Sequence, residues 1–297
     1  MTSLFRHLRS WVVTAPVGTA RYWLCLSVLV SRLGATRAAQ AKILVVALLM
    51  PIRDALPGDK QQRPITFRLR LGERRVNWLV GLKSDVEVLN EVLVLGEYEG
   101  APHGEPTVVL DLGSHIGVSL LFFRQRYPRA RVIGVEPNPR IFPRLSQNVD
   151  QLEAVEVHQV AVAARDGELD FFPAKQAWVS STRPTDDAKR PVKVRGRSLD
   201  GLLAELGLER VDLLKLDIEA GEAAVLAAST RLRDVGAVVG EFDDRGDPAQ
   251  RRTFFALFDG FRLNITGGLG EHTTFVAVGP RWPSGVTSPD ASGTPRA

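Results

Sequence analysis

VVLDLGSHIG, residues 108–117, decides the fold of this 297-residue chain. The apolar start of this stretch is typical of a buried parallel strand, and Asp111 and Gly113 lie where such a strand leaves its sheet. Residues 118–127, VSLLFFRQRY, continue with a helical pattern that Pro128 ends. A strand, a glycine turn and a helix in this order predict an open α/β sheet, which binds its ligand at the carboxyl ends of its strands.

The spacing of this turn separates it from two common phosphate-binding loops. It reads D-x-G-x-x-x-G from Asp111 to Gly117, whereas the dinucleotide fingerprint is G-x-G-x-x-G. His115 takes the place of the second glycine of that fingerprint, so a side chain stands where a pyrophosphate needs bare backbone. No G-K-[ST] follows, which excludes a Walker A loop. We therefore predict a nucleoside ligand without a pyrophosphate, and a close approach of the following helix to the strand at Gly117.

A second apolar run, VIGVEPNP at residues 132–139, supplies an acid for a ribose. Glu136 follows Gly113 by 23 residues, and an acid about 20 residues after such a turn accepts hydrogen bonds from ribose hydroxyls. One carboxylate can accept both hydroxyls, and an acidic site attracts a sulfonium, so S-adenosyl-L-methionine fits. The predicted cofactor-binding residues are Asp111, Gly113, Ser114, His115, Gly117, Glu136, Pro137, Asn138 and Ala161.

A third run, VDLLKLDIEAGE at residues 211–222, carries further acids. Together with DLGSHIG and GVEPNP it resembles the motifs of FkbM-type S-adenosylmethionine-dependent methyltransferases, over roughly residues 84–278. The family usually reads close to K-x-D-x-E-G-A-E, whereas Ala220 and Gly221 stand here in reversed order, and His115 stands where asparagine is usual. The resemblance implies a Rossmann-like class I methyltransferase fold and methyl transfer to a hydroxyl of a glycan, glycolipid or secondary metabolite.

Transfer to a hydroxyl benefits from a general base. We predict that Asp217 and Glu219 act as the general base or position the acceptor, with His115 as an alternative base. A competing interpretation of the two acids is a charge pair stabilised by the dipole of the next helix. Two functional alternatives stay open: a protein that binds the cofactor without turnover, because of the two departures from the family pattern, and a Mg²⁺-assisted enzyme using Asp217 and residues 243–244. No His/Cys spacing indicates zinc, and no resident metal is predicted.

The charge of the chain is unevenly distributed. The net charge is +4, yet residues 1–53 hold seven arginine and lysine residues and no acid. The remainder is therefore acidic, which argues against nucleic acid as a partner of the catalytic domain. The single cysteine, Cys25, excludes an internal disulfide framework and favours a reducing, cytoplasmic location.

Residues 1–57 are predicted to form a basic helical N-terminal extension. Its apolar runs, residues 22–30 and 43–50, are much shorter than the about 20 residues that span a membrane. Two interpretations remain: a helical pair packed on the catalytic domain or a partner, or peripheral contact with an anionic membrane through residues 1–53, with Trp11, Tyr22 and Trp23 at the interface. We expect the methyltransferase domain over residues 58–280 and a disordered tail over residues 281–297.

The other elements follow from periodicity and turn residues. The sequence predicts an α/β chain with strands at 155–162, 211–217 and 237–242, an antiparallel entry sheet within 65–82, an added hairpin at 169–172 and 192–197, an antiparallel final hairpin at 262–266 and 273–278, and helices at 85–98, 140–152, 223–232 and 248–258.

Overall fold

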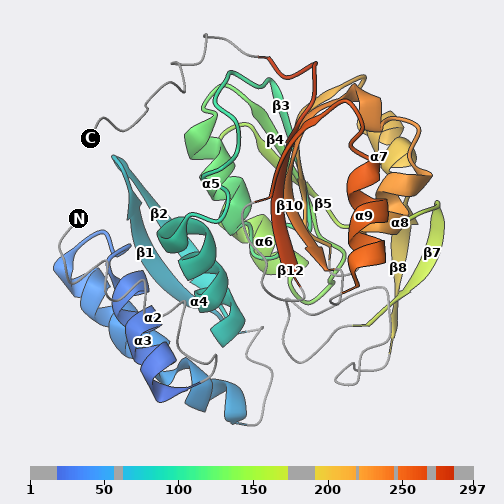
Figure 1. Ribbon diagram of the computed structural model, residues 1–297. Coiled ribbons are helices and arrows are strands. Elements are labelled where there is room, and N and C mark those ends of the chain that lie inside the picture. The colour runs from blue at the N-terminus through green and yellow to red at the C-terminus, as the bar shows by residue number, and fades with distance from the viewer. Residues whose placement is uncertain are drawn as a thin grey trace, which may run out of the picture.

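A seven-stranded sheet lies at the centre of the computed structural model, which describes residues 19–56, 63–172, 191–218, 221–243, 247–265 and 272–283. The strand order is β11-β12-β10-β9-β3-β4-β5. Five strands are parallel, β12 runs antiparallel to β10, and β11 runs antiparallel to β12. The strands are β3 (Val108–Leu112), β4 (Arg131–Val135), β5 (Val155–His158), β9 (Val211–Leu216), β10 (Val235–Asp243), β11 (Arg262–Ile265) and β12 (His272–Val278). The predicted Rossmann-like, mostly parallel sheet with an antiparallel final hairpin is confirmed (Figure 1).

Helices cover both faces of this sheet (Figure 1). One face carries α4 (Lys83–Asn90), α5 (Val118–Arg126) and α6 (Phe142–Val149), and the other carries α7 (Leu199–Glu205), α8 (Glu222–Ala228) and α9 (Pro248–Ala256). Successive side chains of each strand enter opposite cores: Val109 packs with the α5 side, and Leu110 packs with the α7 side. Because both faces are buried, the parallel strands read as continuous apolar runs.

The N-terminal helices α2 (Ala20–Ser31) and α3 (Arg37–Ala55) pack beside a hairpin of β1 (Ile65–Leu71) and β2 (Arg74–Val80). Thr19 and Thr36 cap the two helices, since each hydroxyl accepts a hydrogen bond from the first turn. Tyr22 and Trp23 are buried in the same core as Trp78. The expectation that these two aromatic rings lie at a membrane interface is therefore wrong. Both rings are buried inside the protein, and the Trp23 ring lies 5.9 Å from Lys83 Nζ at the start of α4. Trp11 and the residues of the predicted tail after 283 lie outside the described residues.

Some element boundaries differ from the prediction. The third parallel strand ends at His158, and the following Ala161–Val162 forms β6 of a separate three-stranded sheet with β7 (Gly167–Phe171) and β8 (Val192–Arg197). The helix predicted at 85–98 begins at Lys83, continues as a π-helix, η1, over Glu91–Leu95, and ends at Gly96, whose φ is 75°. The helix predicted at 223–232 ends earlier, at Ala228, and a 3₁₀ turn, η3 (Leu232–Asp234), follows.

Candidate functional site

The glycine turn after β3 joins the three motifs at one edge of the sheet. Gly113 has a φ of 85°, and a Cβ built on it would lie 1.9 Å from the carbonyl oxygen of Asp217, after β9. The N–H groups of Gly113 and Ser114 both donate to the carbonyl oxygen of Val135, at the end of β4, over 2.9 and 3.0 Å. Glycine is therefore required at residue 113 both for its backbone conformation and for its closeness to Asp217.

His115 adopts a left-handed backbone conformation, with a φ of 49°. Asparagine and histidine are among the non-glycine residues most often found there, which explains how histidine can replace the asparagine usual in the family. The His115 N–H donates to Glu136 Oε2 over 2.9 Å. Its ring is 13% exposed, and Nε2 lies 3.5 Å from Asp85 Oδ1. Burial lowers the pKa of His115 to about 4, which makes the imidazole a weak proton acceptor for catalysis.

Glu136 lies directly after β4, beside the glycine turn. It is 6% exposed and accepts hydrogen bonds from the backbone N–H groups of His115 and Asn138. Burial raises the pKa of Glu136 to about 7. Each carboxylate oxygen keeps a further lone pair after accepting one N–H, so the group retains the capacity to accept two hydroxyl donors.

Asp111 is engaged within the protein. Its Oδ1 lies 3.2 Å from Lys215 Nζ, and its Oδ2 accepts a hydrogen bond from the Ser119 hydroxyl over 2.5 Å. Lys215 also donates to the carbonyl oxygen of Gly113 over 2.6 Å and lies 3.3 Å from Asp217 Oδ2. Asp111 thus pairs with Lys215, which in turn donates a hydrogen bond to the glycine turn, and a contact of Asp111 with the cofactor stays a prediction.

Lys215 was not among the predicted site residues. The signal for it is its position: a lysine in the apolar run of residues 211–216, all of which are buried. A lysine in such a strand needs acidic partners. Burial alone would lower its pKa, but the neighbouring Asp111, Asp217 and Glu97 raise it above the ordinary value.

Three of the other predicted cofactor residues lie in the loops after β3 and β4, and the fourth lies in the small sheet. The Ser114 hydroxyl donates to the carbonyl oxygen of Asp111 and accepts the N–H of Val135, so it fixes the turn. The Asn138 side chain accepts the N–H of Arg140, and Pro137 precedes it in the same loop. Ala161 lies in the small sheet, outside the main one.

Gly117 has a different packing partner from the one predicted. A Cβ there would lie 2.9 Å from Leu145 Cδ1 of α6, and φ is 88°. The close approach at this glycine is therefore to α6 rather than to the strand.

Four acidic side chains lie close enough to act on one another, and Lys215 lies beside this group. Asp217 follows β9, Glu241 is in β10, and Glu91 and Glu97 belong to or follow η1. Burial, followed by repulsion between these acids, raises the pKa values of Glu91, Glu97 and Glu241 to about 8. Asp217 has a side chain that is 30% exposed. We call Glu91, Glu97, Asp217 and Glu241 the acidic cluster; Glu219, also predicted for catalysis, lies outside the described residues.

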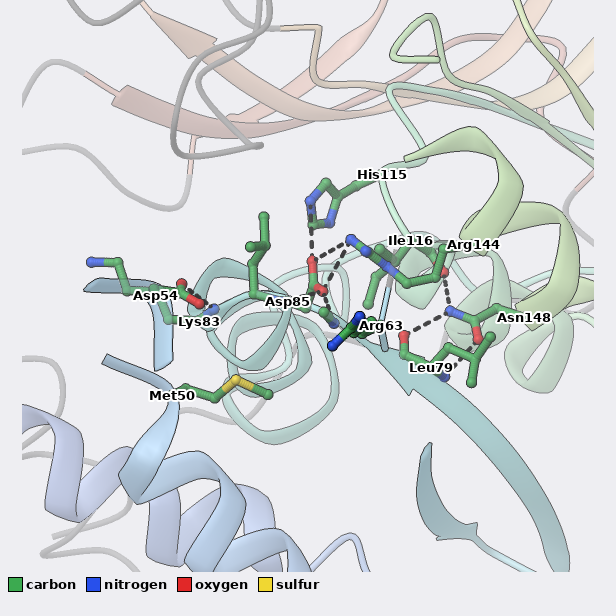
Figure 2. Close-up of polar contacts among 12 residues, drawn as sticks. Met50, Asp54, Arg63, Leu79, Lys83, Asp85, His115, Ile116, Arg144 and Asn148 are labelled. Atoms are coloured by element: carbon green, nitrogen blue, oxygen red, sulfur yellow. Dashed lines mark hydrogen bonds and ion pairs between the residues drawn. The ribbon is translucent and has the colours of Figure 1, made fainter. Parts of the chain in front are cut away.

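A buried network ties the turn to the N-terminal elements (Figure 2). Asp85, at the start of α4, accepts the N–H groups of Gly81 and Leu82 and pairs with Arg144 of α6, whose Nη2 lies 3.1 Å from Oδ2. The Asp85 carboxylate also faces His115 (Figure 2). The conformation of the turn at His115 therefore depends on α4 and α6 as well as on the strands.

Asn148 extends this network to the hairpin. Its side chain accepts the N–H of Leu79 over 2.7 Å and donates to the carbonyl oxygens of Leu79 and Ile116. Lys83 is linked to α3 in the same region, because its N–H donates to Asp54 Oδ2 over 2.8 Å. These bonds connect the N-terminal elements directly to the loop that carries the first motif.

Within the described ranges, no group of three or more His, Cys, Asp or Glu side chains could hold a metal ion. The magnesium alternative involves residue 244, which lies outside the described residues, as does the side chain of residue 243. That alternative stays a prediction.

The chain is similar to methyltransferases over the residues that form this site. The model of the methyltransferase FkbM domain matches residues 111–262, about half of the chain. The chain is 31% identical over 136 residues to the 2-O-methyltransferase NoeI of Sinorhizobium fredii, covering 40% of this chain and 56% of that protein. It is 29% identical over 174 residues to the 31-O-demethyl-FK506 methyltransferase FkbM of Streptomyces tacrolimicus, covering 46% of this chain and 66% of that protein.

Among solved structures, the chain is similar to the fibrillarin of Aeropyrum pernix in complex with natively bound S-adenosyl-L-methionine. The TM-score is 0.43 at 20% identity, over 75% of this chain and 85% of that chain. The chain spans about half to two thirds of the length of the two methyltransferases named above. Because the family model covers half of its residues, including all three motifs, the chain belongs to the FkbM family of methyltransferases.

Proposed function

We propose that this chain is an S-adenosyl-L-methionine-dependent O-methyltransferase that acts on a hydroxyl of a glycan, glycolipid or secondary metabolite. The observation that carries the proposal is the position of Glu136, buried at the end of β4 and bonded to the turn after β3. Family membership supports the reaction class, and the names of the relatives, a 2-O-methyltransferase and a 31-O-demethyl-FK506 methyltransferase, support oxygen as the acceptor atom.

The chemistry of the donor set fits this cofactor. Glu136 retains lone pairs for two ribose hydroxyls, and Asp217, the most accessible acid at this edge of the sheet, provides a carboxylate for a sulfonium. When bound, the cofactor supplies a methyl group that is already activated, so the protein mainly has to align the acceptor. The left-handed conformation at His115 suits histidine and asparagine alike, which removes one of the two reasons for expecting a binding protein without turnover.

Asp217 is the proposed general base of this site. Its carboxylate lies 3.3 Å from Lys215, and its partial exposure leaves it accessible to an acceptor hydroxyl. Glu97 and Glu241, with pKa values raised to about 8, are largely protonated at neutral pH and limit the negative charge around Asp217. Glu219 stays a second candidate for the same role.

Two measurements test the proposal. Calorimetric titration should show binding of S-adenosyl-L-methionine, and a labelled methyl group should transfer from it into a lipid extract or a pool of hydroxylated metabolites. Failure to bind would overturn the cofactor assignment. Binding without transfer into any hydroxylated fraction would instead favour the binding protein that has lost turnover.

A further inference from the structure

Helix α3 exposes a strip of large aliphatic side chains. Val45, Leu48, Leu49 and Ile52 are 38–61% exposed, and Leu56, which caps the helix, is 58% exposed. Their spacing of three and four residues places them along one face of the helix. We call these five residues the apolar strip. Leu24 of α2 is also exposed, and Ile265 is the one remaining exposed large apolar residue in the described part of the chain.

The opposite face of α3 is also apolar. Ile43, Ala47 and Met50 are fully buried against α2 and the β1–β2 hairpin. A helix that is apolar on all sides is normally covered on all sides, and a contiguous exposed apolar patch marks an interaction surface. Figure 1 shows α2 and α3 on the outside of the molecule, beside the hairpin and away from β10 and β12.

The surroundings of the apolar strip are strongly basic. Among the described residues up to 80, ranges 19–56 and 63–80 contain ten lysine and arginine residues and two acids, a net charge of +8, whereas the whole chain has +4. Within this region Arg37 and Lys42 on α3, and Arg32 at the end of α2, are exposed. Arg68, Arg70, Arg74 and Arg75 are exposed on the hairpin. An apolar strip set in a basic region is the arrangement by which a helix lies in the interface of an anionic bilayer.

Charge and side-chain type argue against two other partners that could cover the apolar strip. A second copy of the chain would bring one strongly basic region against another, and like charges facing each other oppose association. A protein partner would be expected to meet aromatic anchor residues, yet the strip is purely aliphatic, and Tyr22 and Trp23 are turned into the core. No helix among the described residues is long and apolar enough to cross a membrane.

We propose that α3 docks the protein on an anionic lipid surface, with the apolar strip inserted at the level of the headgroups and the surrounding cations next to anionic lipid. This docking is independent of the methyl-transfer proposal, because it uses none of the residues at the carboxyl edge of the sheet.

Sedimentation of the full chain with vesicles tests the docking. We expect binding to vesicles of phosphatidylcholine and phosphatidylglycerol, little binding to phosphatidylcholine alone, and a loss of binding as salt rises. The double variant Leu49→Glu/Ile52→Glu should bind at least about tenfold more weakly, because it removes apolar insertion and adds negative charge. The matched control is Ile265→Glu, which alters an exposed apolar residue on β11 and should bind like the wild type.

Both altered residues of the double variant are more than half exposed, so the fold should be retained. An unchanged thermal unfolding midpoint checks this point. The proposal is overturned if the wild type does not bind anionic vesicles, or if the double variant binds as well as the control. It is also overturned if the wild type forms a dimer that the double variant breaks while neither binds vesicles.

Discussion

Lys215 and Asp111 form a buried ion pair across two neighbouring strands, with 3.2 Å between Nζ and Oδ1. The two residues are opposite each other in the register of β3 and β9. The pair lies next to the glycine turn, because the Lys215 ammonium also donates a hydrogen bond to the carbonyl oxygen of Gly113. The buried charges of Lys215 and Asp111 thus stabilise the turn, whereas the Asp217 side chain is 30% exposed.

We expect Lys215→Met to lower the free energy of unfolding by about 3–5 kcal/mol, because it leaves the Asp111 carboxylate buried without its partner. Urea denaturation measures the change. Lys193→Met is the control, since Lys193 pairs with Asp170 on the surface and its loss should change little. Equal effects of the two substitutions would contradict the structural role of the buried pair.

Replacing Glu136 should weaken cofactor binding. Glu136→Ala removes charge-assisted hydrogen bonds, which we expect to cost about 1.5–3 kcal/mol of affinity, or roughly 10–150-fold in Kd. Glu156→Ala is the control, because Glu156 is a partly exposed residue of the neighbouring β5 that pairs with Arg131. Wild-type affinity should also fall as the pH drops through about 7, where the carboxylate becomes protonated. An affinity that is unchanged by Glu136→Ala would refute the ribose assignment.

The sequence could predict the three motifs and their convergence, because buried parallel strands have a strong apolar pattern and their carboxyl ends meet at one edge. It did not reveal that Asp111 pairs with Lys215, since that contact joins residues 104 positions apart in the chain. The inward orientation of Tyr22 and Trp23 was missed for a similar reason. An apolar helix bordered by arginines has the same local pattern whether other parts of the protein or a membrane cover it.

Gly113→Ala should disturb both the fold and cofactor binding. The new methyl group would meet the carbonyl oxygen of Asp217 at 1.9 Å, in addition to the unfavourable φ of 85°. The control is Gly72→Ala, because φ there is 63° but nothing lies within 4 Å of the added Cβ. The control should lose only about 1–2 kcal/mol from its backbone conformation. Gly113→Ala should lose more than this in denaturation and should also weaken cofactor binding. If both variants lost the same free energy of unfolding and Gly113→Ala still bound the cofactor normally, the closeness to Asp217 would not be what requires glycine at residue 113.

The acidic cluster should make stability depend on pH. Folding raises the pKa of Glu97 from 4.5 to about 8, so the folded state holds this proton more tightly than the unfolded state. The contribution of Glu97 to stability is therefore present below about 4.5 and lost as the pH rises through about 8. Glu97→Gln, which stays neutral, should raise the thermal midpoint relative to the wild type at pH 9, with a smaller difference at pH 5.

The control is Glu105→Gln, which alters an exposed glutamate and should show no such dependence on pH. A variant that is equally stabilised at both pH values would point to packing rather than charge.

His115→Asn should preserve activity, because asparagine also adopts the left-handed conformation that the turn requires. The backbone N–H that Glu136 accepts is present in either residue. By contrast, His115→Val places a β-branched residue at a φ of 49°, which should reduce cofactor affinity and stability together. Since the pKa of His115 is about 4, the wild type and His115→Asn should share one pH profile of kcat between pH 6 and 8. If His115→Asn lost kcat but kept its cofactor affinity, the result would instead indicate that the imidazole takes part in catalysis. The predicted pattern, affinity lost only in the valine variant, would assign His115 to the geometry of the turn.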